Sequence, residues 1–296
     1  MKKTLILAAL LGAVGFSSVA NAQSLEAIQN HTKADRETNK DAWDAVATLR
    51  AQMKDFDARK RGRVATVGTM LDDIGPEGLY PMMNELIVDA PFEQARPSVR
   101  QGWRIGLLFA LGRLRNPETR PVLEHVLRTE KDVAILGSAS EALGKLQDEQ
   151  AARVLIELSA GNSARSLAIL KGAGQCRRQV MADYLAARLP TASAAEFDNT
   201  VEALRDVGNA WAWSTDVVAA SGEGDVVRSA AASALLSAWI TNPEKRNDLR
   251  KALLIVDAPN MNTLVVDASK SVTAKDRDAF NALKASLDAN PLHKRK

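Results

Sequence analysis

Apolar residues recur at intervals of three or four along most of the chain, the spacing that places them on one side of an α-helix. The clearest stretch is residues 97–146, which predicts a long helix, a tight turn, a shorter helix and another long helix. One face of the first long helix consists of Val99, Trp103, Leu107, Ala110 and Leu114. Further apolar residues fill the rest of its circumference, which is typical of a helix packed between neighbours.

Copies of this unit occur elsewhere in the chain. Asn116-Pro117-Glu118, which has the residue types of a helix start, returns in the last third of the chain as Asn242-Pro243-Glu244. Leu111-Gly112 in the first long helix returns as Leu143-Gly144 in the next one. One helical pair cannot bury its apolar surface without neighbours, so the copies are expected to stack. The pattern predicts an all-α fold, an α-solenoid of about seven helical hairpins that cover approximately 63–89, 97–129, 131–159, 163–189, 194–220, 226–257 and 261–290.

The opening Asp225-Val226-Val227-Arg228 and the run Ala142–Leu146 resemble HEAT repeats of the short bacterial type, a class also seen in phycobilisome-lyase-like proteins. The resemblance covers about residues 62–260. It implies a right-handed HEAT-like superhelix that acts as an interaction scaffold rather than an enzyme. The expected binding surface is a concave groove lined by the shorter helices, and the expected ligand is a protein partner.

Residues 1–22 have the three parts of a secretory signal: paired lysines, a short apolar run and the small residues Ala20 and Ala22. Cleavage is predicted before Gln23. The apolar run is too short to span a membrane, so no stable membrane insertion is expected after cleavage. These features favour a periplasmic protein, with secretion as the alternative.

Residues 23–61 are predicted to form a polar lead and an amphipathic capping helix, ahead of a repeat domain at 62–290 and a basic, disordered tail at 291–296. The helix carries an apolar stripe at spacings of three or four: Trp43, Val46, Leu49, Met53 and Phe56. The stripe suits a cap that covers the open end of the first repeat, which solenoids require. The same spacing is also found in short coiled coils, so a helix that binds a partner or a second copy is the alternative.

Composition narrows the function classes. The aromatic fraction is 4%, which argues against a sheet of aromatic and β-branched strands. Loss of Lys2 and Lys3 with the signal lowers the formal net charge from +3 to +1, so the basic pI does not indicate nucleic-acid binding. Cys176 is the only cysteine, which excludes an internal disulfide, and a buried thiol is expected there.

Residues that could carry chemistry are few. The chain has three histidines, and His125 falls on the polar side of its predicted helix. No zinc-binding or nucleophile motif occurs, so no metal, cofactor or enzymatic activity is predicted. His125 stays a candidate binding residue.

The most informative oddity is Trp211-Ala212-Trp213, followed by an acidic loop with Glu223 and Asp225. Residues two positions apart lie on nearly opposite sides of a helix, so both rings can hardly be buried on one face. Either both rings fill the gap between irregular hairpins, or they form an exposed platform that anchors a protein or stacks on a sugar. The sequence therefore predicts an exported, non-catalytic scaffold for a protein of the bacterial envelope. The alternative is a carbohydrate- or peptidoglycan-binding module that uses Trp211 and Trp213.

Overall fold

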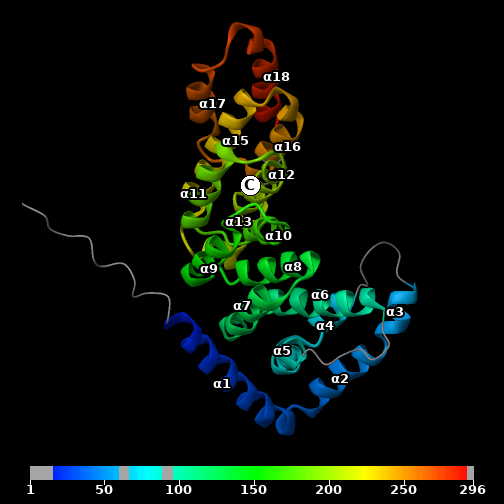
Figure 1. The fold of residues 1–296 in the computed structure, drawn as a ribbon. Coiled ribbons are helices and arrows are strands. Elements are labelled where there is room, and N and C mark those ends of the chain that lie inside the picture. Colours follow the sequence, from blue (N-terminus) through cyan, green and yellow to red (C-terminus); the bar gives the residue numbers. More distant parts are fainter. Residues whose placement is uncertain (1–15, 60–66, 89–95, 292–296) are drawn as a thin grey trace, which may run out of the picture.

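A computed structural model describes residues 16–59, 67–88 and 96–291, and every regular element in these ranges is a helix (Figure 1). The all-α solenoid prediction is confirmed. Much of the predicted signal and the predicted tail from residue 292 onward lie outside the described residues. None of the described helices is long and apolar enough to cross a membrane.

Three helices precede the repeats: α1 (Phe16–Thr38), α2 (Lys40–Ala51) and α3 (Met53–Arg59). α2 packs on the first repeat and α3 on the second, and Val46 of α2 and Met53 of α3 from the predicted stripe are buried. The indole Nε1 of Trp43 donates a 2.9 Å hydrogen bond to Asp35 Oδ2 of α1. The stripe thus packs within the chain, as a cap does.

The first four hairpins each consist of a first helix and a second helix that are joined by a short connection. They are α4 (Val67–Asp72) with α5 (Leu79–Val88), α6 (Pro97–Leu114) with α7 (Arg120–Thr129), α8 (Val133–Gly144) with α9 (Glu149–Ser159), and α10 (Ala164–Ala173) with α11 (Gln179–Arg188). Short 3₁₀ turns, η1 (Gly75–Gly78) and η2 (Pro117–Thr119), precede α5 and α7, and η3 (Leu189–Thr191) follows α11.

The polar turns start these helices by capping their free amide groups. Asn116 Oδ1 accepts a 2.9 Å hydrogen bond from the amide of Glu118, and Asp132 caps α8 in the same way. Arginines cap the opposite ends. Arg165 donates to the carbonyls of Leu127 and Glu130 at the end of α7, which lack partners within the helix.

Glycine lets the first helices approach one another closely. A Cβ on Gly172 of α10 would lie 2.6 Å from the carbonyl oxygen of Gly137 in α8, and one on Gly174 would lie 2.5 Å from the carbonyl of Ala203. The second helices of these hairpins pack on each other less closely. The first helices therefore form the more tightly packed layer. The expected concave groove lined by the shorter helices stays a prediction, and α1 covers part of α5 and α7.

The layer of first helices and the layer of second helices change places at the fifth hairpin. α12 (Ala194–Val207) is followed by two single turns, α13 (Ala210–Trp213) and α14 (Asp216–Ala219), instead of a long second helix. α15 (Gly224–Thr241) then packs beside α11, and α16 (Arg246–Val256), which follows the turn η4 (Pro243–Lys245), packs beside α12 (Figure 1). A 2.7 Å ion pair between Lys245 and Asp198 joins η4 to α12. The last pair is α17 (Met261–Ser269) and α18 (Arg277–Asp288), with η5 (Ala274–Asp276) between them.

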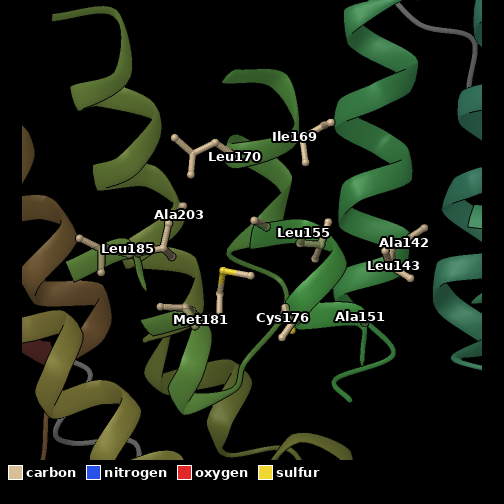
Figure 2. Close-up of a cluster of buried hydrophobic side chains, with 14 of the residues drawn as sticks. Ala142, Leu143, Ala151, Leu155, Ile169, Leu170, Cys176, Met181, Leu185 and Ala203 are labelled. Carbon is tan, nitrogen blue, oxygen red and sulfur yellow. The ribbon is translucent and has the colours of Figure 1, made fainter. Parts of the chain in front are cut away.

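The core is continuous through the stack. Figure 2 shows its middle, where Cys176 lies among apolar side chains of α8, α9, α11 and α12, including Leu143, Leu155, Leu185 and Ala203. Cys176 is fully buried, and burial raises the pKa of its thiol to about 12. The thiol therefore serves as an apolar core group, as expected from its position.

Candidate functional site

The irregular segment between α12 and α15 holds most of the residues that the sequence indicated. Asn209 follows the end of α12, and its side-chain oxygen accepts hydrogen bonds from the amides of Trp211, at 3.0 Å, and Ala212, at 3.3 Å. The hydroxyl of Thr215 donates to the carbonyl of Ala212 at 2.7 Å. These local bonds hold α13 as a fixed turn although it has only four residues.

Trp213 points into the protein. Its side chain is 7% exposed, its Nε1 donates a 2.8 Å hydrogen bond to the carbonyl of Val207, and its ring packs over Gly224. The two-ring platform is therefore not formed, because positions two apart on a helical turn direct their side chains to nearly opposite sides. The interpretation in which both rings fill the gap fails for the same reason.

Trp211 points outward. It is 70% exposed, the highest value among the large apolar side chains described, and Val217 of the next turn is 62% exposed. Exposed single apolar residues are common, but a tryptophan exposed to this extent on a fixed turn is not. This position is the strongest candidate contact for a partner.

The acidic residues of the loop have separate roles. Glu223 Oε1 lies 2.6 Å from Nη2 of Arg178, and its Oε2 accepts a 2.6 Å hydrogen bond from the amide of Gln179. Glu223 thus joins the starts of α11 and α15 and is a structural residue. Asp225 is exposed in the first turn of α15, and its carbonyl accepts a hydrogen bond from Ser229. Within the described residues, no three His, Cys, Asp or Glu side chains gather as a metal site would need.

His125 lies apart from this segment. It is half-buried on α7 in the second hairpin, and its carbonyl accepts a 2.8 Å hydrogen bond from Thr129. The structure therefore does not bring His125 together with the tryptophans. Its imidazole stays an isolated candidate.

A group of basic residues at the ends of the first helices was not predicted from the sequence: Arg113, Arg115, Lys145 and Arg177. They follow Gly112, Gly144 and Gly174, which occupy equivalent positions in successive repeats. The regular recurrence of these glycines, once in each repeat, could have revealed the group. We call these four residues the basic edge.

The comparisons with known proteins agree with this repeat architecture. Residues 88–171 match the family model for HEAT repeats. This part of the chain carries HEAT repeats. The match includes α6 to α9 and most of α10, and it ends before the irregular segment. HEAT repeats are generally scaffolds for protein interactions. No curated protein and no solved structure matches the chain.

Proposed function

We propose that this HEAT-repeat chain is an exported, non-catalytic scaffold that binds another protein of the bacterial envelope and uses Trp211 as an anchor. The observation that carries the proposal is the 70% exposure of Trp211 on a turn fixed by Asn209. Tryptophan is enriched among the few interface residues that supply most of the binding energy. Because the turn is already ordered, this chain loses little conformational entropy when a partner covers the ring.

The surroundings of Trp211 suit such an anchor. Val217 adds a second exposed apolar side chain on the following turn. The buried ring of Trp213 fixes the same segment from beneath. A partner with an apolar pocket would cover Trp211 and find a rigid surface around it.

The proposed location rests on the N-terminal sequence. Cleavage before Gln23 would remove the apolar run and leave the rest of α1. Among the described side chains of α1, Ile28 and Thr32 are buried, and both follow the cleavage point. A mature chain that begins at Gln23 therefore keeps these packing contacts. N-terminal sequencing of the mature protein from the periplasm tests this step.

Affinity purification tests the binding role. A tagged chain is recovered from the periplasm as wild type, as Trp211→Ala and as Arg153→Ala. Arg153 is a control because its side chain is 77% exposed on α9 and makes only an exposed ion pair with Glu149. We expect a specific partner with the wild type and with Arg153→Ala, and its loss with Trp211→Ala. Retention of the partner by Trp211→Ala would refute the role of the ring.

A further inference from the structure

The basic edge stacks cations from three successive repeats. Arg113 lies in the last turn of α6, Arg115 and Lys145 directly follow α6 and α8, and Arg177 follows α10. Arg113 and Lys145 directly follow Gly112 and Gly144. Arg115 and Arg177 come three residues after Gly112 and Gly174. Positive charge is favourable at helix C-termini, where the macrodipole is negative. That explains single cations at these ends, but it leaves open why Arg115, Lys145 and Arg177 lack an acidic partner within ion-pair distance among the described residues.

Arg177 has a buried charge without a counter-charge. It is 6% exposed, and no carboxylate of the described residues lies within 4.0 Å of its guanidinium. Its Nη2 donates a 3.1 Å hydrogen bond to the side chain of Gln175, and its buried Nε has no hydrogen-bond partner among the described atoms. A buried arginine is normally paired, because removing its charge from water is costly.

Asp206, the acid whose charge acts on Arg177, already accepts hydrogen bonds from other side chains. Asp206 Oδ1 accepts a 2.8 Å hydrogen bond from Arg205, and its Oδ2 accepts one of 3.3 Å from Gln175. Burial lowers the pKa of Arg177 to about 10, although Asp206 acts in the opposite direction. Asp206 therefore compensates the charge of Arg177 only in part.

Two more cations adjoin each other on this edge. Arg115 Nη1 donates a 3.1 Å hydrogen bond to the carbonyl of Lys145, so the two residues are neighbours. The Nζ of Lys145 lies 5.5 Å from the ring centroid of Phe109. Within the described part of the chain, neither side chain has a carboxylate within 4.0 Å, whereas Arg113 pairs with Asp72 at 3.1 Å.

The electrostatics agree with this geometry. Burial lowers the pKa of Lys145, Glu141 opposes the shift, and the cations Arg115, Arg113 and Arg177 lower the pKa further. These charges therefore destabilise one another in the free protein. An anion between them would relieve the repulsion.

We propose that the basic edge binds a doubly charged oxyanion group, a phosphate or a dicarboxylate. Lys145 and Arg115 would contact it from the half-exposed rim, and Arg177 would contribute its charge from the buried floor. Guanidinium groups pair with both kinds of oxyanion through parallel N–H donors. The site lies on the layer of first helices and does not involve Trp211, so it adds a ligand to the proposed protein anchor.

Titration calorimetry with inorganic phosphate, at ionic strength matched with sodium chloride, tests the site. We expect saturable binding by the wild type and about tenfold weaker binding by Lys145→Gln and by Arg177→Gln, the loss that corresponds to one charged hydrogen bond. Arg153→Gln is the control and keeps the wild-type affinity. Succinate replaces phosphate in a parallel titration, and saturable binding of either anion identifies the ligand class.

A second measurement separates binding from structure. In phosphate-free buffer, Arg177→Gln is expected to melt at or above the wild-type temperature, because it removes an uncompensated buried charge. A lower melting temperature would assign Arg177 to the core, and Lys145→Gln, a half-exposed position, would then still test the site. The proposal is overturned if the wild type binds neither anion, or if Lys145→Gln binds as Arg153→Gln does.

Discussion

The indole Nε1 of Trp213 donates a 2.8 Å hydrogen bond to the carbonyl of Val207, the last residue of α12. The ring also packs over Gly224, the first residue of α15. Trp213 therefore connects the helix that lacks a long partner with the helix that starts the next pair. This connection stabilises the junction at which the two layers exchange.

Replacement of Trp213 by alanine is expected to lower the free energy of unfolding by about 3–5 kcal/mol, the usual loss for a buried large aromatic side chain. Trp211→Ala serves as the matched control, since that ring is exposed, and it is expected to change the free energy of unfolding by less than about 0.5 kcal/mol. Urea unfolding followed by circular dichroism measures both. Equal losses in the two variants would contradict the assignment of one buried and one exposed ring.

Glu130 predicts a specific loss of stability in acid. Its Oε2 lies 3.1 Å from Arg104 Nε and 3.1 Å from Arg100 Nη2, and it is 5% exposed. Burial pushes the pKa of Glu130 upward, but hydrogen bonds from the amides of Asp132 and Lys131 and from Arg100 outweigh it and leave the pKa below its ordinary value. The ionised form is therefore favoured in the folded state. Its contribution is complete above about pH 4.3, the ordinary pKa, and disappears as the pH falls through the folded-state pKa.

The variant Glu130→Gln removes a buried carboxylate that contacts Arg104 and Arg100, so we expect it to lower the free energy of unfolding at neutral pH by about 1.5–3 kcal/mol, the range for a hydrogen bond to a charged group. Glu157→Gln is the control, because Glu157 is 61% exposed and pairs with Arg128 on the surface, where such pairs contribute about 0–1 kcal/mol. Unfolding curves measured from neutral to acidic pH should show the two stabilities of wild type and Glu130→Gln converging in acid. A constant difference down to the acid limit would contradict the pKa direction.

The crossing of α8 and α10 offers two glycines with opposite expectations. A Cβ on Gly172 would clash with backbone atoms of Gly137 and Glu141, at 2.6 and 2.8 Å, so Gly172→Ala should destabilise the protein by about 1–3 kcal/mol. A Cβ on Gly137 would meet only the carbonyl of Ala168 at 3.6 Å, so Gly137→Ala should stabilise the helix by up to about 1 kcal/mol. Thermal melts of the two variants provide the comparison. A stabilising Gly172→Ala would show that the helices are further apart than described.

Cys176 should resist thiol reagents in the folded protein. Burial raises the pKa of its thiol to about 12, so almost none of it is thiolate at neutral pH, and the thiolate is the reactive form. A chromogenic disulfide reagent should react with one thiol only after denaturant is added. Rapid reaction under native conditions would contradict the packing in Figure 2.

Local signals in the sequence were sufficient for the helices and their starts. Asn116 caps η2 as its residue type predicts, and Ser193 and Glu196 have the residue types and spacing of the capping box that they form. The exchange of layers could not be predicted, because α15 keeps the sequence pattern of a first helix. The segment between Val207 and Gly224 is the part that differs from the other hairpins, and the direction in which it leads the chain depends on tertiary packing.

The candidate site was predictable only in part. Helical geometry placed the two tryptophans on nearly opposite sides of their turn, but it could not say which ring faces the core, because that depends on where α15 lies. Glu223 looked like a loop acid, and its partner Arg178 is distant in the sequence. Each residue of the basic edge, taken alone, could be interpreted as a cation at a helix C-terminus. That they lie along one edge follows only from the stacking of the repeats in the structure.

Site-specific photocrosslinking in cells shows whether the surface around Trp211 contacts another protein. A photoreactive phenylalanine analogue in place of Val217, which is 62% exposed beside the Trp211 turn, keeps the proposed anchor intact. Irradiation of cells should yield one discrete adduct with an envelope protein, and the additional change Trp211→Ala should abolish it. The same analogue at position 153 should yield no such adduct. An adduct that persists with Trp211→Ala, or one that forms from position 153 and not from 217, would contradict the account.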